Sequence, residues 1–204
     1  CGALEFSEKI SKVGTHPIIG TQINLNTFDI IGKISLYATS ETGYKNLTKL
    51  SSLSYLKNKS SYEPYCDIND LTMNNQDLIL LTGNYNNFFG KLFYANKIKH
   101  IEKIIEKLKV SFRDHLYIEI QRHSENQEVN YENYLLKISS TYNLPLIAGQ
   151  EVYYLKPEMA EAHDALICIG EKKFIDDKNR FRYSNQHYLK KSEDLKKIYK
   201  DIPE

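Results

Sequence analysis

The chain has 204 residues, enough for one domain with a hydrophobic core. Its 27 Lys and Arg nearly balance its 26 Asp and Glu, so no overall field favours nucleic acid or an anionic membrane. Three widely spaced cysteines without a C-x-x-C pair argue against a disulfide scaffold and fit a reducing cytoplasm. No apolar run reaches the roughly 18 residues of a membrane span, and no signal peptide is recognisable.

The first part of the chain predicts a helix and then alternating strands and helices. Apolar residues recur every three or four positions in the expected helices and every second position in the expected strands. The expected elements up to residue 83 are a helix at 4–13 ended by Gly14, strands at 21–25 and 30–38 joined as a hairpin, a helix at 44–56 capped by Thr42, a polar loop with one short element at 57–76 and a buried strand at 78–83. A helix so close to Cys1, with no strand before it, predicts a piece of a longer protein; processing or trimming of the chain is the alternative.

The second part continues the alternation. The expected elements are a helix at 93–110, a strand at 115–121, a helix at 127–142, a strand at 144–148, a helix at 157–169, a polar loop at 170–187 and a short helix at 193–199. Regular alternation of strand and helix predicts an α/β fold with a mostly parallel sheet or barrel, whose function lies at the carboxyl ends of the strands.

The usual catalytic motifs are absent: there is no Walker A loop, no G-x-G-x-x-G, no G-x-S-x-G and no H-E-x-x-H. Asp176 and Asp177 lie in a polar loop and are expected to be solvated. The segment 67–70 lacks the glycine and the distal glutamate of a calcium loop. The adjacent His163 and Asp164 are expected to pack or cap a helix rather than form a catalytic dyad.

Two strand ends carry residues that could do chemistry. Glu151 and Tyr153 follow the strand at 144–148, and His123 follows the strand at 115–121. The sequence therefore predicts that His123 and Glu151 lie at the same edge of the sheet. Two such donors are an incomplete metal site, since catalytic zinc generally needs three protein ligands, and a single histidine at a strand end is more often a structural residue.

Several segments together resemble a known family. They are Cys1-Gly-Ala-Leu-Glu-Phe6, Pro17-Ile-Ile-Gly20, Glu41-Thr-Gly-Tyr-Lys-Asn-Leu47, Leu78-Ile-Leu-Leu-Thr-Gly83, Tyr117-Ile-Glu-Ile-Gln121, Asn143-Leu-Pro-Leu-Ile-Ala148, Ala162-His-Asp164 and Asp201-Ile-Pro-Glu204. Their order and spacing resemble the polymerase and histidinol phosphatase (PHP) domain at the N-terminus of bacterial DNA polymerase III alpha subunits, over essentially the whole chain.

The resemblance implies a distorted seven-stranded (β/α) barrel with metal ions at its mouth. In the family, the first two strands and the first histidine-rich ligand motifs would precede Cys1. Residues 1–204 are therefore expected to be a partial PHP domain with an incomplete barrel, and the last ten or so residues lead toward the polymerase palm region.

The remaining ligand positions of the family can be assigned one by one. Gln22 stands where the family tends to have glutamate, and Lys33 where many members have histidine. Gln150 to Tyr153 replaces Asn-Asp-Val-His, so Glu151 stands for the aspartate and Tyr153 for the histidine; only His123 still resembles a ligand. Glutamine lacks the charge that neutralises a divalent ion. A lysine ammonium repels each unit of positive charge by about 4 kcal/mol at about 4 Å with an effective dielectric near 20. We expect a vestigial, catalytically silent site without zinc or manganese.

The resemblance implies that the chain is a segment of a DNA-directed DNA polymerase, a nucleotidyltransferase of chromosomal replication. Magnesium would belong to the palm domain beyond Glu204. The expected partners are the rest of the alpha subunit, the proofreading exonuclease subunit and the replicase holoenzyme, with DNA contacted through the parent protein and no membrane. The alternatives are an active metal-dependent phosphoesterase or 3′–5′ exonuclease and a standalone binding module from a split gene.

Overall fold

The centre of the molecule is a five-stranded mixed sheet. The computed structural model describes residues 2–57 and 63–202. The strands lie in chain order and are β1 (Gly20–Thr27), β2 (Ile30–Ala38), β3 (Leu78–Leu81), β4 (Leu116–Gln121) and β5 (Leu146–Gly149). The pairs β1–β2 and β2–β3 are antiparallel, whereas β3–β4 and β4–β5 are parallel. The outer strands β1 and β5 do not pair with each other, so the sheet of the described residues is open rather than a closed barrel.

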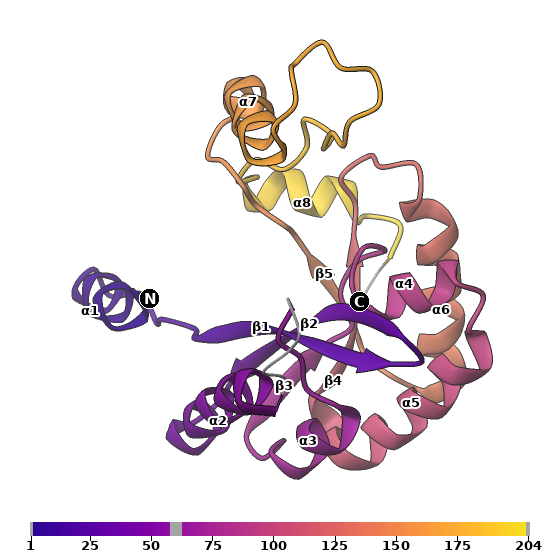
Figure 1. The fold of residues 1–204 in the computed structure, drawn as a ribbon. Helices are drawn as coiled ribbons and strands as arrows, with labels where there is room; N and C mark the ends of the chain where they lie inside the picture. The colour runs from indigo at the N-terminus through magenta and orange to yellow at the C-terminus, as the bar shows by residue number, and fades with distance from the viewer. Residues whose placement is uncertain (1, 58–62, 203–204) are drawn as a thin grey trace.

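Most of the helices flank this sheet, whereas the first one projects beyond the start of β1 (Figure 1). They are α1 (Ala3–Lys12), α2 (Glu41–Lys57), α3 (Ile68–Met73), α4 (Phe88–Tyr94), α5 (Ile98–Phe112), α6 (Glu128–Tyr142), α7 (Ala160–Glu171) and α8 (Ser192–Ile198), with 3-10 turns at Arg113–His115 and Pro157–Met159. The apolar faces of α2, α4, α5 and α6 pack on the sheet, as period-3.6 patterns predict. None of the helices in the described part of the chain is both long and apolar enough to cross a bilayer.

The β1–β2 hairpin shows how the sequence positions one wall of the later site. Ile23 and Leu25 are buried in the core, so the alternate residues of the hairpin point to its other face. The two-residue turn is formed by Phe28 and Asp29, both with positive φ (52° and 62°). This conformation favours glycine or asparagine. Phe28 compensates by packing its ring against His100 of α5, with centroids 3.9 Å apart.

A glycine fixes the hairpin against the helical layer. An added Cβ at Gly32 would lie 2.5 Å from the Phe88 Cα, so only glycine permits this approach between β2 and α4. Lys91 adds a hydrogen bond from its Nζ to the Ile31 carbonyl (2.8 Å). The hairpin is thus held by α4 and α5 as well as by its own strand pairing.

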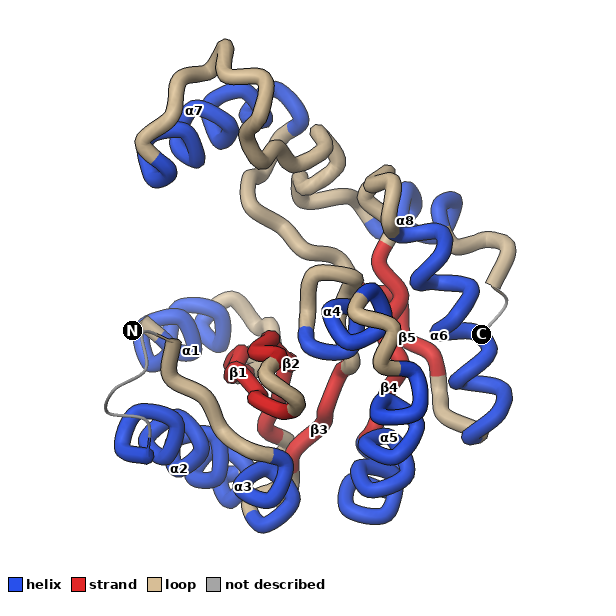
Figure 2. The backbone as a smooth tube through the Cα atoms, turned by 45° about the vertical axis from the view of Figure 1, so that its right-hand side comes forward, coloured by secondary structure: helices blue, strands red, loops and turns tan. Residues whose placement is uncertain are grey.

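The α7–α8 region lies beyond the carboxyl ends of β4 and β5, apart from the main helical layer (Figure 2). Arg122, directly after β4, connects the two. Its guanidinium donates to both carboxylate oxygens of Glu132 on α6 (2.9 and 2.6 Å) and to both oxygens of Asp201 (2.6 and 2.8 Å). Planar, two-pronged pairing of this kind is specific to arginine.

Four expectations from the sequence need correction. The sheet is not mostly parallel, because β2 is antiparallel to both neighbours. The helix expected at 93–110 is two helices, since Asn96 adopts a positive φ between α4 and α5. The cap of α2 is Ser40 rather than Thr42: the Gly43 N–H donates to the Ser40 hydroxyl (3.2 Å). The strand expected from residue 144 begins only at Leu146.

Candidate functional site

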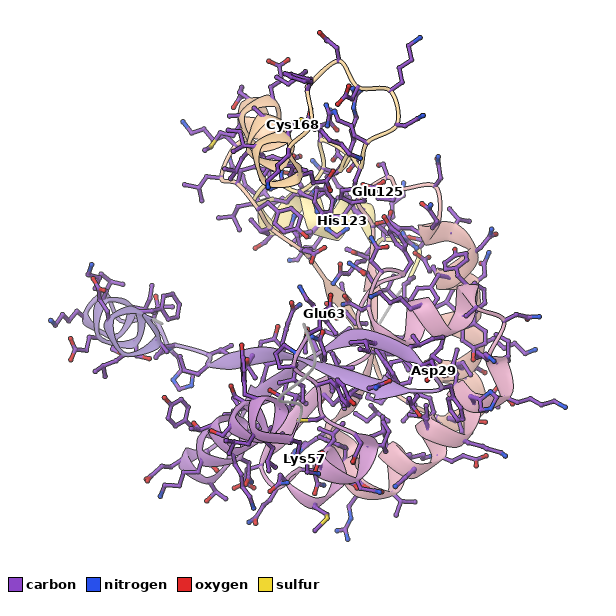
Figure 3. The ribbon with its side chains drawn as sticks, viewed as in Figure 1. Asp29, Lys57, Glu63, His123, Glu125 and Cys168 are labelled. Atoms are coloured by element: carbon purple, nitrogen blue, oxygen red, sulfur yellow. The ribbon has the colours of Figure 1, made fainter. Side chains whose placement is uncertain are left out.

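A polar cleft of about 530 Å³ opens at the carboxyl ends of β3 and β5, against the solvent-facing side of the hairpin. Its lining combines lysines, carboxylates, amides and aromatic rings: Asn24, Lys33, Glu63, Asn84, Asn86, Asn87, Lys91, Glu151, Tyr153, Phe181 and Tyr183. In Figure 3 Glu63 lies on the hairpin side, whereas His123 and Glu125 lie toward α7 and α8. The position agrees with the rule that α/β proteins keep function at the carboxyl ends of their strands.

Asn84 connects three strand ends at the base of the cleft. It follows β3, and its Nδ2 donates to Gln121 Oε1 at the end of β4 (3.2 Å) and to Glu151 Oε2 after β5 (3.1 Å). The Glu151 carboxylate is therefore oriented by an amide. Sequence reasoning missed Asn84, although its place directly after the β3 run is the same signal that identified Glu151.

His123 is buried behind Glu151, with 2% of its surface exposed. The Glu151 N–H donates to its Nε2 (3.1 Å), and its Nδ1 lies 3.2 Å from Glu128 Oε1. Because Nε2 accepts, the ring proton lies on Nδ1 and is donated to Glu128. His123 is thus a neutral imidazole whose two nitrogens are both engaged inside the protein. The expectation that His123 and Glu151 are neighbours is confirmed, but His123 does not line the cleft.

The Glu128 carboxylate completes this arrangement. It accepts the backbone N–H of His123 with both oxygens (2.8 Å each) and that of Glu125 (3.0 Å). Burial alone would raise the pKa of Glu128, but hydrogen bonds from the His123 ring and from these N–H groups outweigh it and hold the pKa below the ordinary 4.5. Glu128 therefore stays charged and fixes the orientation of His123.

A second histidine stacks on the first. The His187 ring lies parallel to that of His123, with centroids 4.2 Å apart. Its Nδ1 lies 3.2 Å from the Glu151 carbonyl oxygen, to which it donates, and its Nε2 lies 3.6 Å from Glu125 Oε1. Burial and the neighbouring His123 lower the pKa of His187, so the ring is neutral. The sequence offered no signal for His187, which falls in the expected polar loop.

Tyr153 is held in an aromatic cluster at the rim of the cleft. Its ring stacks on His163 of α7 (5.0 Å between centroids), and its hydroxyl donates to that of Tyr183 (3.1 Å). Burial and the hydrogen bond with Tyr183 raise the pKa of Tyr153, so the phenol is protonated. Asp164 pairs through both oxygens with Arg180. His163 therefore packs, as the sequence predicted, whereas Asp164 pairs with Arg180 instead of capping the helix.

The remaining two assigned positions lie on the hairpin. Lys33 of β2 lines the cleft, whereas Gln22 of β1 does not; the Gln22 Nε2 contacts the Ser35 hydroxyl at 3.4 Å. The structure thus brings Lys33, Glu151 and Tyr153 to one cleft. It leaves Gln22 beside that cleft and His123 behind it.

Glu119 is a buried carboxyl group that sequence reasoning did not single out. Its Oε1 accepts from the Gln121 Nε2 (2.7 Å), while its Oε2 has no hydrogen-bond partner among the described residues. A Cβ at Gly149 would overlap its Oε1, so Gly149 makes room for it. Burial raises the pKa of Glu119. A glutamate inside the apolar run of β4 was the available signal.

Other acidic residues have local structural roles in a helix cap and a turn. Asp67 and Asp70 form a capping box at the start of α3. Asp177 accepts the Phe174 N–H (2.8 Å) and shapes its loop. Across residues 2–57 and 63–202, no group of three or more His, Cys, Asp or Glu side chains is arranged to hold a metal ion.

Comparison with known proteins identifies the family. Residues 1–123 match the family model of the PHP domain. The chain is 32% identical to the DNA polymerase III subunit alpha of Caulobacter vibrioides and 33% identical to that of Borreliella burgdorferi, in both cases over 100% of its length. It is 34% identical to the same subunit of Rickettsia bellii over 99% of its length. The chain spans 18%, 19% and 17% of these relatives, respectively. A model match over more than half of the chain and whole-chain similarity to these subunits show that the chain belongs to the PHP domain family.

Proposed function

We propose that this chain is a segment of a DNA polymerase III alpha subunit, in which its PHP domain is catalytically silent and supports the polymerase core. Whole-chain similarity to alpha subunits supports the polymerase context. In this proposal nucleotidyl transfer and its magnesium belong to a palm domain outside residues 1–204, and the protein works in the cytoplasm. Sequencing the DNA on both sides of the region that encodes residues 1–204 tests whether the chain is part of a polymerase subunit. We expect the reading frame to continue, and stop codons on both sides would refute the proposal.

The engagement of both His123 nitrogens carries the proposal of a silent site. A metal ligand must offer a free lone pair, and the Nε2 lone pair of His123 already accepts the Glu151 N–H. Lys33 brings a cation into the cleft, and Tyr153 offers a protonated phenol instead of an imidazole. This donor set does not fit the divalent metal site of the family, so no catalytic step through a metal is assigned.

The silent site can be tested with the chain itself. We expect no hydrolysis of bis(p-nitrophenyl) phosphate above the rate of Mn²⁺ or Zn²⁺ in buffer, and no saturable Mn²⁺ uptake in equilibrium dialysis. Metal-dependent turnover that disappears in both Glu151→Gln and His123→Ala would establish an active phosphoesterase instead. Glu151→Gln is the more informative variant, because Glu151 is only partly buried and its removal leaves the His123 contacts to Glu128 intact.

We further propose, from the family resemblance, that the domain docks the separate proofreading exonuclease subunit. Co-elution of the full alpha subunit with that subunit in size-exclusion chromatography is expected. Its persistence after deletion of residues 1–204 would locate the docking surface elsewhere.

A further inference from the structure

Positive charge is concentrated near one end of this nearly neutral chain. Residues 172–200 contain ten Lys and Arg but four Asp and Glu, a net charge of +6, whereas the whole chain has +1. The preceding α7 has the opposite sign, with Glu161, Asp164 and Glu171. Asp164 is already paired with Arg180. The charge therefore changes sign along the α7–α8 region, and the excess of lysine and arginine begins in the loop that leaves α7.

That loop, residues 172–183, is called the basic loop here. Lys172, Lys178 and Arg182 are exposed in it. Of its two acids, Asp176 is exposed and Asp177 is committed to the turn through the Phe174 N–H. The loop thus presents several cations at a surface that solvent and a polyanion can reach.

The basic loop is braced by its own side chains. Arg180 Nε and Arg182 donate to the Ile175 carbonyl oxygen (3.1 and 2.9 Å), and Lys173 Nζ donates to the Asn179 carbonyl oxygen (3.2 Å). Arg180 also ties the loop to α7 through Asp164. Such bracing fixes the shape of the loop before any ligand arrives, which lowers the entropy cost of binding.

Two adjacent large apolar side chains of this loop face solvent. Phe174 is 81% exposed and Ile175 is 56% exposed. The two side chains are exposed although the loop backbone is ordered, because the hydrogen bonds just described hold that backbone in place. Two adjacent exposed apolar groups beside charges give the loop an apolar surface on which a ligand can pack.

Further rings continue from the basic loop toward the cleft. The Phe181 and Tyr183 rings are 4.6 Å apart, and the Tyr183 and Tyr153 rings 4.7 Å apart. The first pair meets edge to face and the second is tilted. Aromatic side chains with cations beside them recur in surfaces that bind single-stranded nucleic acid, where bases stack on rings and lysines contact phosphates.

We propose that the basic loop is a binding site for single-stranded nucleic acid, in which Lys172 and Lys178 contact phosphates and Phe174 stacks on a base. Exposed lysines beside an exposed aromatic ring favour a nucleic acid over an acidic polypeptide as the ligand. An acidic polypeptide would pair with the lysines but would offer no base to stack on Phe174. The proposal rests on the basic loop and the rings beside it, and it does not depend on whether the cleft is catalytically silent.

Fluorescence anisotropy with a labelled oligothymidylate, measured over a range of salt concentrations, tests the proposal on the chain. Lys172→Gln/Lys178→Gln should lower the slope of log affinity against log salt by about 1.4, since each phosphate contact on a single strand contributes about 0.7. Phe174→Ala should weaken binding about fivefold or more with the slope unchanged, because one stacked base is worth about 1 kcal/mol or more.

The matched control is Lys99→Gln/Lys103→Gln, which removes the same charge from the exposed face of α5. It should bind like the parent chain, and all variants should keep the parent melting temperature because the changed side chains are exposed. Absence of oligothymidylate binding, or equal weakening by the control pair, would overturn the proposal. So would equally strong competition by polyglutamate, which would identify an acidic polypeptide as the ligand.

Discussion

Replacing His123 by alanine should destabilise the folded chain, because three interactions are lost together. The hydrogen bond from Nδ1 to the charged Glu128 is worth about 1.5–3 kcal/mol, and that from the Glu151 N–H to Nε2 about 1 kcal/mol. The stack on His187 adds about 0.5–1.5 kcal/mol. We therefore expect the free energy of unfolding to fall by about 3–5 kcal/mol, a large part of the stability of a typical domain.

Urea unfolding of the parent chain, His123→Ala, Glu128→Gln and the double variant measures this loss and its coupling. The coupling between positions 123 and 128 should be about 1.5–3 kcal/mol. His16→Ala is the control, because His16 is exposed, and it should leave stability unchanged. A loss below about 1 kcal/mol, or stabilisation of the parent chain by Zn²⁺ that His123→Ala abolishes, would refute the structural role of His123.

Two further predictions concern Arg122 and the space beside Glu119. Hydrogen bonds from Arg122 lower the pKa of Asp201 to about 2, so the stability contributed by this pair is present above the ordinary value of 3.8 and is lost as pH falls toward 2. In Arg122→Gln the pKa of Asp201, followed by NMR, should return toward 3.8. An unchanged titration would show that the pair is not formed in solution. Gly149→Ala should destabilise the chain by about 1–3 kcal/mol because its Cβ overlaps Glu119. Gly170→Ala in α7 meets no neighbouring atom and should stabilise it by about 0.5–1 kcal/mol; thermal melts in which both glycine variants shift in the same direction would contradict this reasoning.

Strands β1 to β4 were predictable from the sequence because their burial alternates or is nearly continuous, whereas β5 is only partly buried. The expected strand at 30–38 coincides with β2, and Ile23 and Leu25 are buried as alternation requires. No glycine or proline marks the break between α4 and α5, and its one local signal is Asn96, a residue type that tolerates positive φ. Asn96 adopts its positive φ where the chain turns from one packed helix to the next, and that turn is a property of the tertiary structure.

The site was predictable only in part, and for a similar reason. The rule that strand ends meet at one edge correctly made His123 and Glu151 neighbours. It could not reveal that the two residues bind each other, nor that Glu128 orients the imidazole. His187 reaches the same place from an irregular loop, which carries no periodic pattern. The contacts that fix the protonation and orientation of His123 are therefore tertiary, whereas the sequence shows only that His123 follows a strand.

The turn of the β1–β2 hairpin has a consequence for the order of folding. Phe28 and Asp29 both occupy the left-handed region, so this turn alone is a poor nucleus for strand pairing. The contacts that offset it, Phe28 on His100 and Gly32 on Phe88, need α5 and α4 to be in place first. We expect the hairpin to form after these helices, with amides of β1 gaining protection later than those of α5 in pulsed hydrogen exchange. Simultaneous protection would show that the hairpin needs no helical template.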